Sequence, residues 1–197
     1  MSRQQSIIER SPERDDALLR LMGADPFPGW NVAGLRAVAG EHADLLFLGG
    51  AAEMVEASID LADRRMEEAA GEIYMEGWHT PQRIRAVVAL RLQQNRPHRV
   101  AIGRSLVVLG LPGRGLVAAR AAARTADSIW VAAGDQSVDF SWYTKRAILA
   151  PIYAATLLYW LADRGGDDTA TLAFLDKRLA ATAVIGKLRR RLFPKAA

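Results

Sequence analysis

The residues of this chain that could do chemistry are three histidines, several adjacent acid pairs and one glycine-rich turn. His42, His79 and His98 lie in three separate segments, without the short helical spacing that lets histidines share a metal ion. The turn at residues 110–115 lacks the lysine and hydroxyl residue of a phosphate-binding loop. The chain contains no cysteine, which excludes thiol catalysis and disulfide scaffolds. These residues therefore give no support to an enzyme, and we expect no metal and no cofactor.

Charge is distributed unevenly along the 197 residues, although the formal net charge is only +4. Residues 1–77 contain 15 acidic and 7 basic side chains, residues 78–124 contain 9 basic and no acidic ones, and residues 187–197 contain 5 basic and no acidic ones. The arginines of residues 78–124 either pair with the acidic face of residues 53–76 or form a basic face toward anionic lipid or an acidic partner. The sequence leaves both interpretations open.

Start and stop signals divide the chain into about nine helices. Apolar residues recur every three to four positions, and nothing alternates with the period of two that is typical of a strand. The apolar run at residues 147–162 is shorter than the roughly 20 residues of a membrane span, so we interpret it as a buried core helix. The fold class is all-α, with expected helices at residues 11–22, 31–39, 43–48, 51–75, 80–94, 97–109, 116–133, 141–163 and from 168 or 169 onward.

The N-terminal quarter has the layout of a helix-turn-helix unit attached to a helical body, which resembles TetR-type regulators. A recognition helix must approach a polyanion, yet no Lys or Arg lies between Arg36 and Arg64. The sequence therefore argues against DNA binding. We expect three parts: a vestigial helix-turn-helix subdomain at 1–50, a helical ligand-binding body at 51–186 and a basic amphipathic tail at 187–197.

Residues 134–147 read Gly-Asp-Gln-Ser-Val-Asp-Phe-Ser-Trp-Tyr-Thr-Lys-Arg-Ala. This stretch resembles the signature of the ubiquinone (coenzyme Q) biosynthesis accessory proteins of mitochondria and alphaproteobacteria, a TetR-like, non-enzymatic, lipid-binding family. The resemblance extends over roughly residues 15–185, with further matching pieces at Gly29-Trp30, Leu46-Phe47, Thr171, Phe174-Leu175 and Arg178.

The resemblance implies a protein that holds a polyprenylated quinone precursor, or a phospholipid, and presents the precursor to the demethoxyubiquinone di-iron hydroxylase. It also implies that the hydroxylase docks at Asp139, Trp142 and Tyr143, although core packing at a helix start is the alternative for the two aromatic residues. TetR-like bodies usually dimerise through their last two long helices, so a homodimer is expected. The alternative functions are a ligand-responsive TetR-type transcriptional regulator and a helical adaptor without a ligand.

Helical periodicity selects the residues that would line a lipid cavity in such a body. Small residues on packed helices would leave room for an isoprenoid tail, while a solid core is the alternative for each position. The candidate lining residues are Leu106, Leu109, Ile129, Ile148, Ile152, Leu157 and Phe174.

The C-terminal residues form a short basic amphipathic segment that suits a bilayer interface. A solubilising tail is the alternative, and Gly186 would break the helix. The absence of a presequence in residues 1–10 favours a bacterial cytoplasmic protein that associates peripherally with the inner membrane. The candidate membrane-contacting residues are Lys187, Leu188, Arg189, Arg190, Arg191, Leu192 and Phe193.

Overall fold

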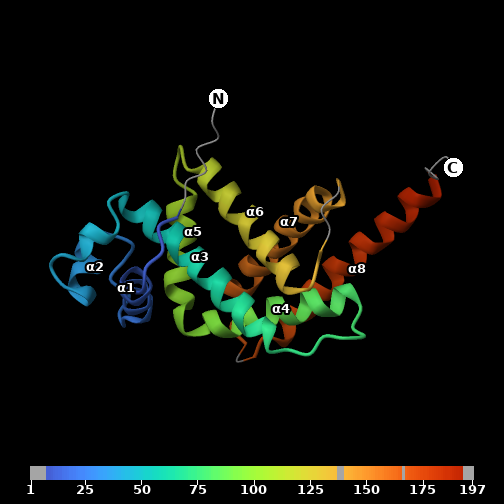
Figure 1. Ribbon diagram of the computed structural model, residues 1–197, viewed down its shortest axis with the longest axis horizontal. Helices are drawn as coiled ribbons and strands as arrows, with labels where there is room; N and C mark the ends of the chain where they lie inside the picture. Colours follow the sequence, from blue (N-terminus) through green and yellow to red (C-terminus); the bar gives the residue numbers. More distant parts are fainter. Residues whose placement is uncertain (1–7, 137–139, 166, 193–197) are drawn as a thin grey trace.

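The computed structural model describes residues 8–136, 140–165 and 167–192, and the regular structure of these residues is entirely helical (Figure 1). The all-α prediction is confirmed. In place of about nine helices, the described residues form eight α-helices and two short 3-10 helices: α1 (Pro12–Gly23), α2 (Val32–Ala39), η1 (Ala43–Leu46), α3 (Gly50–Gly71), α4 (Thr80–Asn95), η2 (Arg96–His98), α5 (Arg99–Leu109), α6 (Gly115–Ala132), α7 (Phe140–Ala162) and α8 (Thr169–Leu192).

The helix starts follow the capping signals in the sequence. The Ser11 side chain accepts a hydrogen bond from the backbone N–H of Arg14 at 3.2 Å, and the Asn31 side chain accepts one from Gly34 at 2.8 Å. Each bond satisfies a backbone N–H that has no partner inside the helix. Gly40 follows α2 with a φ of 96°, a conformation that glycine adopts without steric cost.

Two predicted helices are shorter than expected. The helix predicted at residues 43–48 is the single 3-10 turn η1, because two glycines follow directly and too few residues remain to nucleate an α-helix. The helix predicted at residues 51–75 ends at Gly71, since glycine is a weak helix former.

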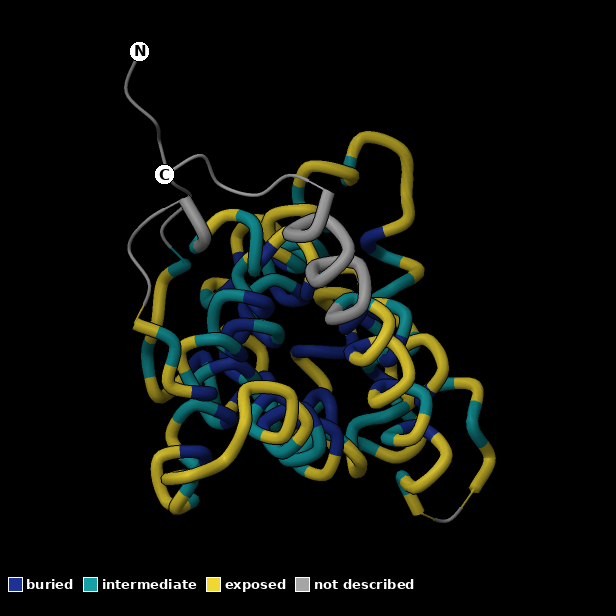
Figure 2. Tube along the Cα trace, turned by 90° about the vertical axis from the view of Figure 1, so that its right-hand side faces the viewer, coloured by how far each residue is buried: buried dark blue, intermediate teal, exposed yellow. Residues whose placement is uncertain are grey.

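Helix α3 connects two hydrophobic clusters. Its first half, with Met54 and Leu61, packs into a cluster with α1, α2, η1 and the inner face of α5. Its second half, with Met66, packs into a cluster with α4, α6, α7 and α8. A 22-residue helix is about 33 Å long, so α3 reaches through both clusters. The tube view shows the buried residues gathered inside the ring of helices (Figure 2).

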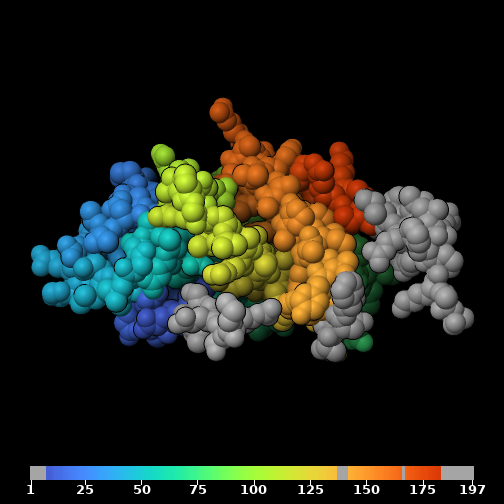
Figure 3. Space-filling model, turned by 90° about the horizontal axis from the view of Figure 1, so that it is seen from above, coloured from blue at the N-terminus to red at the C-terminus, as the bar shows by residue number. Residues whose placement is uncertain are grey.

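The last three long helices pack in chain order, α6 on α7 and α7 on α8, while α3 packs on the other side of α6 (Figure 3). The prediction that residues 147–162 form a buried core helix is only half correct. One side of α7 is buried through residues such as Leu149 and Trp160. The other side is exposed at Ile148 and Leu158, while the partly exposed Tyr159 stacks on Phe174 of α8.

Candidate functional site: an apolar cavity with a polar end

A cavity of about 390 Å³ lies where α3, α4, α5, α6 and α7 meet. The alanine face of α6 creates the space, because alanines three and four residues apart share one side of a helix and fill less volume than the leucines opposite them. Trp30 also lines the cavity, and its indole N–H donates to the Ala101 carbonyl at 2.9 Å. The lining residues are Met22, Trp30, Ser58, Ile59, Ala62, Arg91, Asn95, Ile102, Ser105, Leu106, Leu109, Gly110, Ala118, Ala121, Ala122, Thr125, Tyr153, Ala154 and Leu157.

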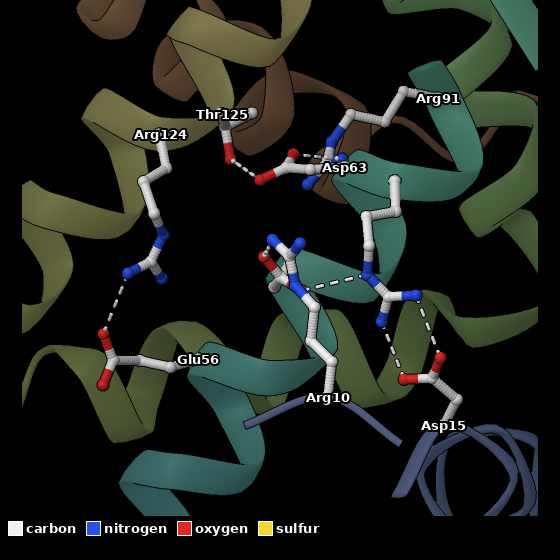
Figure 4. A network of polar contacts seen from close by, with 9 residues as sticks. Arg10, Asp15, Glu56, Asp63, Arg91, Arg124 and Thr125 are labelled. Carbon is white, nitrogen blue, oxygen red and sulfur yellow. Dashed lines mark hydrogen bonds and ion pairs between the residues drawn. The ribbon is translucent and has the colours of Figure 1, made fainter. Parts of the chain in front are cut away.

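One end of the cavity is polar and carries a buried ion pair. Arg91 on α4 lies 2.6 Å from Asp63 on α3 (Nη1 to Oδ1), and both side chains are almost fully buried. The Thr125 hydroxyl on α6 donates to the other Asp63 oxygen at 3.1 Å. Figure 4 shows Arg91 and Thr125 both pointing at Asp63. The Arg91 Nε donates to the Tyr153 hydroxyl on α7 at 2.6 Å, so four helices meet in one polar cluster.

Burial shapes the acid–base behaviour of this cluster. Burial raises the pKa of Asp63 to about 6, although Arg91 and Thr125 act to lower it. Burial also raises the pKa of Tyr153 above its ordinary value, against the opposing influence of Arg91. Burial disfavours the charged form of an acid, so Tyr153 is a neutral hydrogen-bonding group at physiological pH.

A second polar cluster, one turn before Asp63 on α3, holds the N-terminal segment against that helix. Asp60 accepts hydrogen bonds from Arg10 at 2.7 and 2.9 Å and from Arg64 at 3.0 Å. Arg64 also binds Asp15 of α1 through two bonds of 2.7 and 2.9 Å. Burial acts to raise the pKa of Asp60, but the bonds from the two arginines outweigh it and hold that pKa below its usual value.

Comparison with known proteins finds similarity over the segment that contains the cavity helices α6 and α7. The COQ9 family model matches residues 116–186. The rat protein named "Ubiquinone biosynthesis protein COQ9, mitochondrial" is 39% identical over 100 residues, which cover 51% of this chain and 32% of the rat protein. The human protein of the same name is 38% identical over 100 residues, covering 51% and 31%, and the Xenopus tropicalis protein is 36% identical over 107 residues, covering 54% and 34%.

The match to the COQ9 family model is thus confined to residues 116–186 of the chain. The resemblance seen in the sequence is therefore confirmed, although the family model matches a shorter range than residues 15–185. The chain spans about a third of the length of the curated relatives that it matches. These three relatives are eukaryotic, so the bacterial origin stays a prediction.

Three of the seven predicted lining residues, Leu106, Leu109 and Leu157, line the cavity. The other four do not line it. Ile129 and Ile152 are buried in the hydrophobic cluster that the second half of α3 forms with α4, α6, α7 and α8. Ile148 is 44% exposed, and Phe174 stacks on Tyr159 at a ring distance of 4.7 Å.

Two of the predicted docking residues, Trp142 and Tyr143, lie in the first turn of α7, inside the segment that matches the COQ9 family model. Asp139 lies outside the described residues. The Trp142 ring is half-buried, with the Arg146 guanidinium 4.1 Å from its centroid and Tyr143 packed edge-on at 4.8 Å. Tyr143 is 67% exposed. Core packing therefore explains the buried part of the Trp142 ring, but it does not explain the exposed ring of Tyr143.

The predicted membrane tail continues α8 without a break at Gly186. The backbone of Lys187, Leu188, Arg189, Arg190, Arg191 and Leu192 is helical, and the side chains of these residues, together with Phe193, lie outside what the structure describes. Within the described residues, no helix combines the length and the hydropathy that crossing a bilayer requires.

Some arginines of the basic segment 78–124 pair with acidic residues, and others form an exposed basic face, so both interpretations hold in part. Arg91 pairs with Asp63, and Arg124 approaches Glu56 at 3.5 Å, so two arginines do meet the acidic helix. Two others pair with α8 and the turn before it, through Arg85–Asp176 at 3.0 Å and Arg96–Asp168 at 2.7 Å. Arg104 and Arg120 are exposed, without an ion pair to any described residue.

Sequence reasoning missed the polar end of the cavity, although a signal was present. Arg91 follows Val87 and Val88 at helical spacing, which places it on the buried face of α4. A buried arginine requires a partner, and that requirement pointed to an acid on a neighbouring helix. The position of Tyr153 opposite Arg91 had no comparable signal. In the described part of the chain, no three His, Asp or Glu side chains gather as metal ligands.

Proposed function

We propose that this chain is a non-enzymatic, lipid-binding accessory protein of ubiquinone biosynthesis, which holds a polyprenylated quinone precursor and presents it to a di-iron hydroxylase. The observation that carries the proposal is the apolar cavity, whose walls include α6 and α7 of the COQ9-family segment. The names of the curated relatives supply the pathway.

The size of the cavity supports a lipid with a compact head. Ligand pockets occupy about 300–1,000 Å³, and the 390 Å³ here lies near the lower end of that range. The space suits a quinone ring with the first part of its tail or a segment of a phospholipid chain. The remainder of a long polyprenyl tail extends beyond the cavity.

Lipid analysis of natively purified protein tests this proposal. We expect organic extracts to contain an isoprenoid quinone precursor or a phospholipid, identified by mass spectrometry. The variant Ala122→Leu places a larger side chain in the cavity and should lower the lipid carried per protein severalfold. The matched control Ala119→Leu makes the same change on the exposed side of α6. Protein that is repeatedly empty, or equal lipid in both variants, would contradict the proposal.

Docking of the hydroxylase is proposed for the exposed surface at the start of α7. Tyr143 offers an exposed aromatic ring with a polar tip, a residue type that is enriched at interfaces. Tyr143→Ala should abolish co-purification of the hydroxylase while leaving thermal unfolding nearly unchanged. Trp142→Ala should also abolish it but should lower the melting temperature, because the Trp142 ring packs under Arg146. Undiminished association of both variants would refute this docking surface.

Membrane contact is proposed for the basic segment that ends the chain. Deleting residues 187–197 removes five basic side chains and should weaken binding to anionic liposomes, mainly at low salt, since the Debye length is about 8 Å at physiological ionic strength. Replacing the exposed Arg104 and Arg120 by Gln tests the alternative basic face. Binding that survives the deletion but not the replacement would move the contact to α5 and α6.

A homodimer is proposed through the exposed apolar side of α7. Ile148, Leu158 and Tyr159 are open to solvent on that side, and exposed apolar patches mark interaction sites. Leu158→Lys should convert a dimer into a monomer in analytical ultracentrifugation. An unchanged mass would place the dimer contact elsewhere or exclude it.

The alternative of a TetR-type regulator has less support. The helix expected to read DNA is the single turn η1, and its Asp44 is already paired with Arg36 at 2.7 Å. Placing net negative charge against phosphates is repulsive. Sequence-specific DNA binding that survives physiological salt would favour the regulator instead.

A further inference from the structure

The hydroxyl of Tyr153 is a buried hydrogen-bonding group on a residue that lines the cavity. Tyr153 lines the cavity and is 6% exposed. Its oxygen already accepts a hydrogen bond from Arg91 at 2.6 Å. A phenol has one proton of its own to donate, and no described residue accepts it.

Three neighbouring helices fix the position of that hydroxyl. Arg91 contacts both Tyr153 and Asp63, and Thr125 holds the second oxygen of Asp63. The Tyr153 oxygen is thus attached to α3, α4 and α6 through a chain of buried polar contacts. A donor that is held in this way loses little conformational freedom when a ligand accepts its proton.

The charge of the cluster selects the kind of acceptor. Arg91 and Asp63 compensate each other within one ion pair, so the polar end carries no surplus positive charge when Asp63 is ionised. A carboxylate or phosphate would enter without a counter-ion, which is costly in a buried site. A neutral oxygen, such as a ring carbonyl or a phenol, meets the Tyr153 proton without that cost.

Most of the remaining lining is apolar. Ile102, Leu106 and Leu109 of α5 contribute to it, and so does Leu157 of α7. A molecule with one neutral polar head and a hydrocarbon tail therefore has one favourable orientation. A purely hydrocarbon ligand would leave the Tyr153 proton unpaired, which is unfavourable for a buried donor.

We propose that Tyr153, held in place by Arg91, donates a hydrogen bond to a neutral oxygen on the head ring of the bound lipid, with the tail directed toward α5. This inference rests on the proposed lipid-binding function and adds the orientation and the head-group chemistry. Tyr153 is the residue that specifies the head group, and Arg91 is a positioning residue.

Binding of short probes to the purified full chain tests the inference. The probes are decylubiquinone, which has ring carbonyls, and farnesene, an isoprenoid hydrocarbon without oxygen. Tyr153→Phe keeps the ring and removes the donor, and should weaken decylubiquinone binding about fivefold to tenfold, as the loss of one hydrogen bond predicts. Farnesene binding should stay the same. The matched control is Tyr159→Phe, which removes a hydroxyl from the same helix outside the cavity, and it should change neither affinity.

A spectroscopic readout separates hydrogen bonding from a change of shape. The infrared carbonyl band of bound decylubiquinone should be shifted to lower frequency in the wild type and should return toward its free position in Tyr153→Phe. Loss of that shift together with the loss of affinity supports the assignment.

Each other outcome contradicts it. Unchanged decylubiquinone affinity and band position in Tyr153→Phe would overturn the role of Tyr153 and leave the lipid-binding proposal intact. Equal loss of both probes would show a deformed cavity and would also overturn it. Phosphatidylcholine serves as a third probe, and dependence on Tyr153 for its binding but not for that of decylubiquinone would overturn the ring assignment. A wild type that binds none of these probes would overturn both proposals.

Discussion

Asp60 and Asp63 lie one turn apart on α3, and both pair with arginine, yet they behave in opposite ways. Asp60 faces the N-terminal segment and binds Arg10 and Arg64, whose side chains are 59% and 32% exposed. Asp63 faces the cavity and pairs with Arg91, which is 5% exposed. The pKa of Asp60 lies below its usual value, and that of Asp63 is raised to about 6.

The difference shows that pairing with an arginine does not always lower the pKa of an aspartate. At the Asp60 cluster, water still solvates the arginines, so the aspartate stays charged at a low cost in desolvation free energy. At the Asp63 cluster, both partners are removed from water, and the desolvation cost approaches or exceeds the attraction between them. The first cluster fastens α1 to the body. The second is a costly feature that borders a cavity, which is typical of functional sites.

Removal of Arg91 should have the largest effect on stability. Arg91→Met keeps much of the side-chain volume but leaves Asp63 buried without a partner, and such losses cost about 3–5 kcal/mol. The free energy of unfolding, measured by urea denaturation at pH 8, should fall by that amount. At pH 5 the loss should be smaller, because Asp63 then takes up a proton.

Arg64→Met is the matched control at the Asp60 cluster, where Arg10 continues to pair with Asp60. We expect a loss of about 1–2 kcal/mol, near the lower end of the roughly 1.5–3 kcal/mol that hydrogen bonds to charged groups contribute, because the arginines of this cluster are partly exposed. Equal losses for the two arginine variants would remove the distinction between the clusters.

The pH dependence of the free energy of unfolding should report the raised pKa of Asp63. Its pKa is about 6 in the folded protein and 3.8 as the ordinary value, so between these pH values the folded state keeps a proton that the unfolded state has lost. The free energy of unfolding contributed by Asp63 therefore falls as pH rises from about 4 to about 6. The wild type should lose up to about 3 kcal/mol relative to Asp63→Asn across this window. A constant difference between the two proteins would show that the folded pKa is not raised.

Much of the fold followed from local signals in the sequence. The caps at Ser11 and Asn31 and the glycine after α2 set helix ends that the structure confirms. Amphipathic spacing also located α3 and α8. The exposed side of α7 was not predicted, because a helix that is apolar all round gives no periodic signal to distinguish its covered face from its open one.

The candidate site was harder to predict for a physical reason. A cavity is a property of packing between helices, so the sequence identifies apolar faces but not whether they meet. Leu106 and Leu157 face the open space, whereas Ile129, with the same apolar character, lies in a filled region. The Arg91–Tyr153 contact joins residues 62 positions apart, and no local pattern reports such a pairing.

A smaller loss in the free energy of unfolding is expected at Asp60. Its dependence on pH should be opposite to that of Asp63. Asp60→Asn keeps the shape but weakens the bonds from Arg10 and Arg64, for a loss of about 1–2 kcal/mol near pH 7. Because the folded pKa of Asp60 lies below its ordinary value of 3.8, this stability is present above about pH 4 and is lost as pH falls further. Added salt should reduce the loss, since the arginines are exposed.

A pair that lies wholly on the surface sets the baseline for this last comparison. Arg36 and Asp44 form a close pair outside both clusters, and Arg36→Gln should leave unfolding unchanged within error. If Asp60→Asn has as little effect as Arg36→Gln, the bonds to Asp60 do not fasten the N-terminal segment, and α1 must be held by its apolar cluster and by other polar contacts such as Arg14–Glu53.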